Sequence, residues 1–228
     1  MRPTVLLFDI DGTLVSTGGA GRRAIDRAFV LATGREAVID FSFAGMTDPA
    51  IVRRTLVNMD LPADLAAIEA VLEAYLTVLE EEVYSAPRFV IHEGIPEALA
   101  AAEGWSRVAV GLGTGNIERG ARVKLSRGDL HHRFAFGGFG SDSEDRAELL
   151  RKGAERGAAR LGATIEECRV VIIGDTPKDV AAAIAIGAES IGVGTGPFTP
   201  AELRECGATW AFSSLLEDGA MSALRGDR

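Results

Sequence analysis

Two acidic residues, Asp9 and Asp11, directly follow a short apolar run near the start of the 228-residue chain. Alternate side chains of an extended segment point the same way, so both carboxylates could face one site. Gly12 follows at once and would let the backbone turn where a side chain would not fit. Buried carboxylates are costly without a positive partner, so the pair predicts a cation nearby. The structural alternative is a turn rich in Asp and Gly.

Two later apolar runs also end in polar residues. One is followed by Gly-Thr-Gly-Asn at 113–116, and the other by Gly-Asp-Thr-Pro-Lys-Asp at 174–179. In open parallel sheets, ligands bind outside the carboxyl ends of the strands. We therefore expect the three strand ends to form one site, to which the third contributes Asp175.

Three polar residues at these strand ends need separate consideration. Asn116 could simply cap the helix that follows it. Asp179 could be a helix-capping residue only, with Thr176 as the N-cap. A hydroxyl at the end of a buried strand needs a partner, which favours a functional role for Thr114.

The elements that must position these residues alternate along the chain. Continuous apolar runs predict strands covered on both faces, at 5–8, 108–112, 170–173 and 190–193. A further short strand is expected at 135–137. Helical patterns separate the later strands, at 117–127, 144–161 and 177–186. The alternation predicts an α/β fold with a Rossmann-like parallel sheet.

Residues 16–87 break this alternation and have helical patterns only. Between Leu65 and Val83, apolar residues recur at three- and four-residue steps, as in an amphipathic helix. We expect a helical module inserted after the first strand, with hinges at 18–21 and 85–87. The predicted division is therefore an α/β core of residues 1–15 and 88–228 and a helical domain of residues 16–87. The tail after 218 is expected to form a short helix.

Composition narrows the classes of function. Hydrophobic residues make up 47% of the chain and charged residues 25%, which is typical of a globular domain with a sizeable core. The net charge of −9 argues against nucleic-acid binding, which needs basic surfaces.

No apolar run has the length of a membrane span, and the start of the chain lacks a signal-peptide pattern. We expect a cytoplasmic protein with no nucleic-acid or membrane partner and an undetermined oligomeric state. Cys168 and Cys206 are expected to be reduced, with a disulfide as the alternative.

Taken together, the three strand ends resemble the motifs of the haloacid-dehalogenase-like hydrolase superfamily. Residues 9–13, Asp-Ile-Asp-Gly-Thr, resemble its DxDGT motif, Thr114 resembles the second motif, and residues 174–179 resemble GDxxxD. The helical insert is similar to the C1 cap of that family. The resemblance covers about residues 4–215 and is greatest to the phosphoglycolate-phosphatase and β-phosphoglucomutase branch.

The resemblance implies Mg²⁺-dependent hydrolysis of a small phosphorylated metabolite through an aspartyl-phosphate. Asp9 would be the nucleophile. Asp11 would protonate the leaving oxygen and later deprotonate water, which requires a proton at neutral pH. Since a free Asp has a pKa of about 3.9, burial or a neighbouring carboxylate would have to raise the pKa of Asp11. The metal would be held by the side chains of Asp9 and Asp175 and the backbone carbonyl of Asp11, a ligand set that suits Mg²⁺.

The same resemblance implies a phosphate-binding set. The Thr114 hydroxyl and backbone N–H groups at Gly12, Gly115 and Asn116 would hold the phosphoryl oxygens. The start of the following helix, at Ile117, would add a further anion-binding group.

The chain departs from the family at the third motif, which is usually a lysine. Arg146 stands near the expected position. If Ser143 were the N-cap, Arg146 would occupy the third helical position, where a cation opposes the helix dipole. A residue type that is locally unfavourable, such as a cation at a helix N-terminus, suggests a functional role. We therefore predict that Arg146 orients Asp9 and the phosphoryl group, with Lys124 as the second candidate. Asp179 and Lys124 are otherwise expected to support the site from behind.

Other activities of this superfamily, and a non-catalytic role, differ in the residues that they require. A phosphonatase would need a cap lysine, and no lysine precedes Lys124. A haloacid dehalogenase would not need the acid at Asp11. A β-phosphoglucomutase-like mutase keeps every residue named above and stays an alternative, whereas intact Asp9 and Asp11 disfavour a non-catalytic phosphometabolite-binding module.

For the remaining polar segments and residues, the sequence gives weaker evidence of a role in the site. Residues 46–48 lie between predicted helices and could reach the substrate. The glycine-rich segment 192–197 is interpreted as a late loop, because it lacks a full dinucleotide-binding spacing. Four arginines could meet a second anionic group but are better explained as surface residues: Arg22, Arg23, Arg53 and Arg54.

Overall fold

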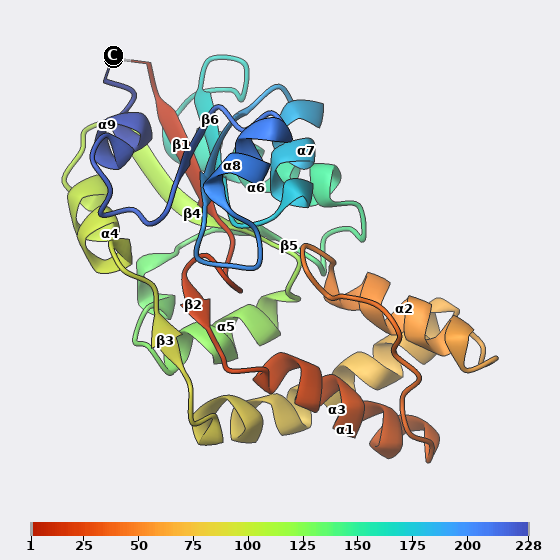
Figure 1. Cartoon of the computed structure of the whole chain (residues 1–228). Helices are drawn as coiled ribbons and strands as arrows, with labels where there is room; N and C mark the ends of the chain where they lie inside the picture. Colours follow the sequence, from red (N-terminus) through yellow and green to blue (C-terminus); the bar gives the residue numbers. More distant parts are fainter. Residues whose placement is uncertain (1, 228) are drawn as a thin grey trace.

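The first strand lies in the middle of a six-stranded parallel sheet of order β5-β4-β1-β6-β7-β8. The computed structural model describes residues 2–227 and is shown in Figure 1. The strands of this sheet are β1 (Thr4–Phe8), β4 (Val108–Thr114), β5 (Gly137–Phe139), β6 (Arg169–Gly174), β7 (Glu189–Val193) and β8 (Trp210–Phe212).

The register of β1 brings three strand ends to one level. Phe8 pairs with Leu112 of β4 and with Ile173 of β6. Every residue of β1 is buried, which explains its continuous rather than alternating apolar sequence. The polar residues that follow these three strands therefore meet at the same edge of the sheet.

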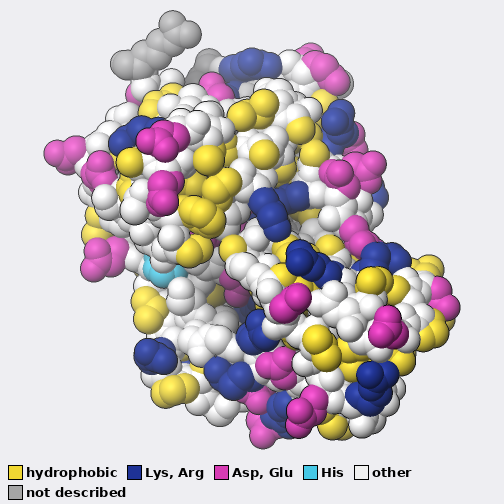
Figure 2. Space-filling model, turned by 45° about the vertical axis from the view of Figure 1, so that its right-hand side comes forward, with side chains coloured by type: hydrophobic (Ala, Val, Ile, Leu, Met, Phe, Trp, Pro, Cys, Tyr) yellow, Lys and Arg dark blue, Asp and Glu magenta, His cyan; other side chains and the backbone are white. Residues whose placement is uncertain are grey.

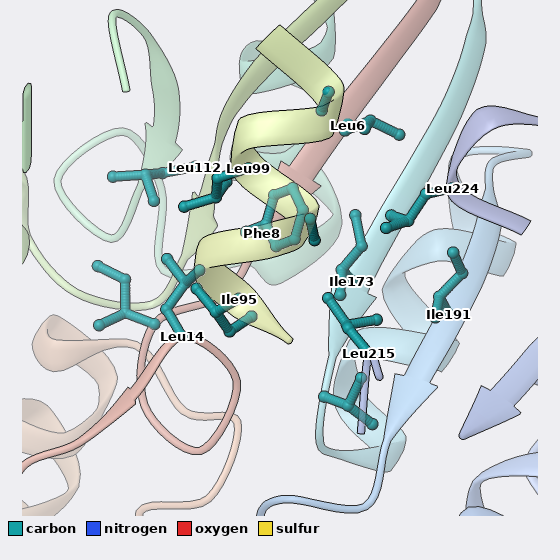
Figure 3. Packing of buried hydrophobic residues seen from close by; sticks show 14 of the residues in the cluster. Leu6, Phe8, Leu14, Ile95, Leu99, Leu112, Ile173, Ile191, Leu215 and Leu224 are labelled. Carbon is teal, nitrogen blue, oxygen red and sulfur yellow. The ribbon is translucent and has the colours of Figure 1, made fainter. Parts of the chain in front are cut away.

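Helices cover both faces of the sheet. Their bounds are α4 (Ile95–Glu103), α5 (Glu118–Ser126), α6 (Arg146–Arg160), α7 (Pro177–Ala185), α8 (Pro200–Glu205) and α9 (Ala220–Arg225), with a short 3₁₀ helix at His131–Arg133. Leu6 and Phe8 pack on one face, where Figure 3 shows Phe8 beside Ile95 and Leu99 of α4. Val5 and Leu7 lie in a separate cluster with residues of α6 and α7.

A second lobe contains α1 (Ala20–Thr33), α2 (Asp48–Asn58) and α3 (Leu65–Ser85). Figure 1 shows these three helices together beyond one edge of the sheet, with the core helix α5 beside α3. They share their own apolar cluster, built around Phe29, Leu56, Tyr75 and Leu79. The chain enters and leaves this helical module through β2 (Val15–Ser16) and β3 (Val90–Ile91), which pair antiparallel.

The structure confirms the predicted fold class, an α/β core with a parallel sheet and an inserted helical domain. The division at residues 15 and 88 stays a prediction. The expected strand at 135–137 is misplaced by two residues, because β5 uses the glycines that follow. A Cβ at Gly138 would lie 1.8 Å from the Leu149 carbonyl oxygen, so this strand needs small residues where α6 packs closely.

Several elements were not predicted. The helix α4 is rich in alanine and gives a weak apolar stripe, and β8 and the β2–β3 pair are too short for a periodic signal. The expected C-terminal helix is present as α9. Both cysteines are free. Among the described residues, every helix is too short or too polar to span a membrane.

Candidate active site

A cavity of about 490 Å³ lies where the ends of β1, β4 and β6 meet the helical module. Most of the predicted site residues line it: Asp9, Asp11, Gly12, Gly115, Asn116, Lys124, Arg146 and Asp175. Thr114 and Asp179 are buried directly behind them, with 0% and 1% exposure. The module contributes an apolar wall of Ile25, Phe43, Met46, Ile51 and Tyr75.

Arg146 links two buried carboxylates. Its Nη2 atom lies 2.9 Å from Asp9 Oδ2 and 2.5 Å from Asp179 Oδ1. Burial raises the pKa of Asp9 to about 6, while Arg146 acts in the opposite direction and Asp179 adds to the rise. Burial also disfavours the charge of Arg146, but the two carboxylates outweigh it and raise the pKa of the guanidinium. The structure thus places Arg146 on Asp9, as predicted.

The predicted helix position of Arg146 was wrong. The N-cap of α6 is Asp145, whose side chain accepts a hydrogen bond from the Glu148 backbone N–H. Ser143 instead donates its hydroxyl to the Glu148 carboxylate. Arg146 is therefore the first residue of the helix rather than the third. Its cation still lies at the positive end of the helix dipole, and the two buried carboxylates compensate for that position.

Asp11 has a different cation, Lys124. Asp11 Oδ2 accepts hydrogen bonds from Lys124 Nζ at 2.6 Å and from Asn116 Nδ2 at 2.8 Å. The Lys124 side chain is 5% exposed, whereas that of Asp11 is 46% exposed. Burial opposes the charge on Lys124, but the carboxylates of Asp11 and Asp48 raise its pKa. Lys124 therefore pairs with Asp11 rather than with Asp9, and of the two features considered for Asp11, burial and a neighbouring carboxylate, burial is not observed.

The buried carboxylates fit a divalent cation. Ligand atoms of Asp9, Asp175 and Asp179 lie within 4.8 Å of one another, and Arg146 supplies one positive charge against these three carboxylates. Burial, followed by repulsion from Asp9 and Asp179, raises the pKa of Asp175 to about 8. Hard cations such as Mg²⁺ prefer carboxylate oxygens. The cluster therefore has both the ligand type and the unbalanced negative charge that Mg²⁺ requires.

Asp179 has too many protein partners to be a free ligand. Its Oδ1 accepts hydrogen bonds from Arg146, and its Oδ2 accepts them from the Thr176 backbone N–H and hydroxyl. These bonds complete a capping box at the start of α7. The capping interpretation and the supporting role thus coexist, and Asp9 and Asp175 remain the side chains best suited to a metal.

Glycines shape the space around Asp175. Gly12 has a φ of +82°, and a Cβ there would lie 2.3 Å from Asp175 Oδ2. A Cβ on Gly196 would lie 1.7 Å from the same oxygen. The neighbouring Thr195 hydroxyl donates to the Gly12 carbonyl at 2.5 Å.

Sequence reasoning missed the contribution of Thr195 and Gly196. Of the segment 192–197, the first two residues end β7 and only 194–197 form the predicted loop, in which both residues line the cavity. No motif pointed to them. The available signal was their position after the next strand of the sheet, β7, because consecutive parallel strands end at the same edge.

At the start of α5, the structure excludes the capping alternative for Asn116 and gives the Ile117 N–H a partner within the chain. Asn116 does not cap α5, whose N-cap is Ile117 without a side-chain bond. The Asn116 amide instead donates to Asp11 Oδ2 and Thr114 Oγ1. The Ile117 N–H, expected to help bind an anion, already donates to Asp48 Oδ2 at 2.9 Å. Residues 46–48 thus reach the site, although Asp48 is the first residue of α2 rather than part of a loop.

Of the four arginines considered for a second anionic group, Arg22 alone is part of the cavity wall as described. It stacks over Phe43 with its guanidinium carbon 4.9 Å from the ring centre. Arg23 and Arg53 form ion pairs with glutamates, and Arg54 lies over Phe41. Figure 2 shows basic side chains along the junction of the two lobes, with acidic side chains among them.

Comparison with known proteins agrees with this geometry. A family model for haloacid dehalogenase-like hydrolases matches residues 3–187, a range that contains all three predicted motifs. A search of curated proteins found no match.

Several solved structures have a similar fold. A predicted phosphatase from Clostridium acetobutylicum has 16% identity and a TM-score of 0.69, with 99% of this chain and 100% of that chain covered. A predicted phosphoglycolate phosphatase from Haemophilus somnus has 13% identity, a TM-score of 0.66 and coverage of 100% and 98%. A protein from Bacteroides vulgatus, provisionally named a beta-phosphoglucomutase, has 21% identity, a TM-score of 0.66 and coverage of 99% and 90%. At these identities the likeness shows a shared fold.

Proposed function

Because the chain belongs to the haloacid dehalogenase-like hydrolase family, we propose that it is a Mg²⁺-dependent phosphatase acting on a small phosphorylated metabolite through an aspartyl-phosphate. One observation carries the proposal. The two carboxylates that follow β1 have separate cations, with Asp9 on Arg146 and Asp11 on Lys124. Phosphate ester hydrolysis by this route needs one carboxylate that attacks and another that moves protons.

Asp9 is the proposed nucleophile. A carboxylate oxygen of Asp9 attacks phosphorus, and the bond from phosphorus to the leaving oxygen breaks in the same step. The Arg146 contact at 2.9 Å fixes the orientation of this carboxylate and places positive charge beside the oxygens that gain charge. Such pre-placed charge is a major contribution to catalysis in enclosed sites.

Asp11 is the proposed proton carrier. Its carboxyl group donates a proton to the leaving oxygen, and the alcohol departs. Asp11 then accepts a proton from water as the water oxygen attacks phosphorus, so that the bond to Asp9 breaks and inorganic phosphate is released. The half-exposed position of Asp11 on the cavity wall gives it access to both the leaving group and water.

The metal and the phosphate contacts follow from the same arrangement. The side chains of Asp9 and Asp175 and the backbone carbonyl of Asp11 would hold Mg²⁺, which supplies positive charge against the phosphoryl oxygens. Phosphoryl oxygens are proposed to bind the Thr114 hydroxyl and groups of Gly12, Gly115, Asn116 and Arg146. The phosphoglycolate-phosphatase type of substrate is part of this proposal, and a cavity of about 490 Å³ has room for this and for larger phosphorylated metabolites.

Asp9→Asn tests the proposal directly. The wild-type protein with Mg²⁺ should release inorganic phosphate from p-nitrophenyl phosphate and from members of a panel of phosphorylated metabolites. Asp9→Asn should remove this activity, because an amide cannot form the aspartyl-phosphate. Asp129→Asn, which changes a carboxylate that is 97% exposed, should behave as wild type. Equal phosphate release by Asp9→Asn and wild type would refute the mechanism.

The same panel separates the phosphatase from the mutase alternative. A phosphatase releases inorganic phosphate, whereas a β-phosphoglucomutase-like enzyme moves the phosphoryl group within a sugar phosphate. Analysis of the sugar products by NMR would show which of the two occurs.

A further inference from the structure

Asp48, at the start of α2 in the helical module, holds the core backbone on both sides of Asn116. Its backbone N–H donates to the Gly115 carbonyl at 2.8 Å. Its side-chain Oδ2 accepts the Ile117 N–H at 2.9 Å. Asp48 is 7% exposed, so both bonds form in a buried interface. One residue of the module thus clamps three consecutive residues of the core.

The clamped segment has little freedom to move. A Cβ on Gly115 would lie 2.2 Å from the Met46 carbonyl oxygen, so the module backbone lies directly against the core here. On the other side, the Gly140 N–H donates to the Asn116 carbonyl at 2.8 Å. The position of Asn116 is therefore set by the core and the module together.

The same segment controls the two donors to Asp11. Asn116 Nδ2 and Lys124 Nζ both donate to Asp11 Oδ2. Asn116 lies within the clamp, and Lys124 lies on α5, the helix that begins directly after Ile117. The N-cap of α5 makes no side-chain hydrogen bond of its own, so its first N–H groups need acceptors from elsewhere. Asp48 of the module accepts the Ile117 N–H, and Ser141 of the core accepts the Glu118 N–H at 3.3 Å.

We propose that Asp48 is a positioning residue that couples docking of the helical module to the placement of Asp11. The argument rests on the proposed function, since it gives Asp11 the proton-transfer role. When the module is docked, the Asp48 bond fixes Ile117 and the start of α5, and thereby Asn116 and Lys124. Asp11 then has a defined position relative to the leaving oxygen. When the bond is absent, the two donors to Asp11 lose the anchor that the module provides.

The dependence on the leaving group distinguishes this role from a structural one. Aryl phosphates such as p-nitrophenyl phosphate have a stable leaving anion and need little help from a proton donor. Alkyl phosphates need the donor, which contributes about 100-fold to 10,000-fold. Asp48→Ala should lower kcat for an alkyl ester about tenfold more than for p-nitrophenyl phosphate, a partial loss of that contribution. Asp48→Asn retains an oxygen that accepts the Ile117 N–H and should restore most of the difference.

The experiment compares kcat for p-nitrophenyl phosphate with kcat for the fastest alkyl substrate among glycerol 2-phosphate, phosphoglycolate and hexose phosphates. Asp64→Ala is the matched control, because Asp64 caps α3 within the module through the Ala67 N–H and is exposed. It should leave the alkyl-to-aryl ratio at the wild-type value. Hydrogen exchange of the Ile117 amide gives a readout independent of turnover and should be faster in Asp48→Ala only.

Each outcome decides between the alternatives. An unchanged alkyl-to-aryl ratio in Asp48→Ala, in an active wild-type background, would overturn the proposal and leave the proposed function intact. Failure of Asp48→Asn to restore the ratio would also overturn it. Absence of phosphate release by the wild-type protein would instead refute the proposed function, and the positioning role with it, whatever the exchange of Ile117 shows.

Discussion

Asp9 and Asp11 lie two residues apart in the chain but have different surroundings. The cluster of Asp9, Arg146 and Asp179 is buried and consists of core residues. The module touches it through a long contact of 3.5 Å from Arg146 Nη1 to the Gly45 carbonyl. Asp11, in contrast, is half exposed and its two donors are held by a segment that the module clamps.

The difference separates two functions of the site. The sheet and the helices of the core supply both the proposed nucleophile, Asp9, and the cation beside it. The group proposed to transfer protons also requires contact with the module, which forms the other wall of the cavity. A change in the first cluster should therefore affect all substrates, whereas a change around Asp11 should affect substrates according to their leaving group.

The largest effect is expected for Arg146→Ala. This change removes the cation that holds Asp9, so kcat with p-nitrophenyl phosphate and with alkyl esters should fall alike, by about 100-fold to 1,000-fold. Arg146→Lys should recover part of the activity, because one positive charge returns without the two-carboxylate geometry. Arg151→Ala, an exposed change on the same helix, is the control for effects on α6. Near-normal turnover of Arg146→Ala would show that Asp9 does not need this cation.

Lys124→Met should have a smaller and more selective effect. The methionine keeps the buried chain volume, while Asp11 loses the donor at 2.6 Å. We expect kcat for alkyl esters to fall on the order of 100-fold, within the range for proton transfer, and kcat for p-nitrophenyl phosphate to change less. Stopped assays of phosphate release measure both.

Lys152→Met provides the comparison for Lys124→Met. Lys152 is exposed and donates to the Asp142 carbonyl, away from the cavity lining. It should leave both rates unchanged. An equal loss for aryl and alkyl esters in Lys124→Met would contradict the division between the two carboxylates.

Sequence analysis predicted the cluster around Asp9, which consists of core residues, better than the contacts around Asp11, which also involve the module. Continuous apolar strands and the polar residues after them fix which residues meet at the sheet edge, and Asp9, Asp175 and Arg146 do meet there. Arg146 was found through the resemblance and its position, although the N-cap assigned to its helix was wrong.

The contacts around Asp11 could not be predicted from the sequence. The bond from Ile117 to Asp48 joins residues 69 positions apart, and that from Lys124 to Asp11 joins residues 113 positions apart. Both depend on the rotation of α5 and on where the module docks, which no local pattern encodes. Thr195 was missed for a similar reason, because it reaches Gly12 across 183 residues.

The smallest effect concerns the charge of Asp48. Burial raises the pKa of Asp48 to about 6, although Lys124 and the Ile117 N–H act in the opposite direction. An unfolded Asp has a pKa of about 3.9, so the stability associated with protonated Asp48 is complete below about pH 4 and is lost as the pH rises through 6. Asp48→Asn cannot ionise and avoids this loss. Its melting temperature relative to wild type should therefore rise between pH 4 and pH 8, by about 2–4 °C for each kcal/mol of unfolding free energy.

Asp64→Asn, at an exposed cap, should show no such rise. A constant difference between Asp48→Asn and wild type across this range would mean that the docked module tolerates the charge of Asp48, and that the Ile117 bond and Lys124 fully offset its burial.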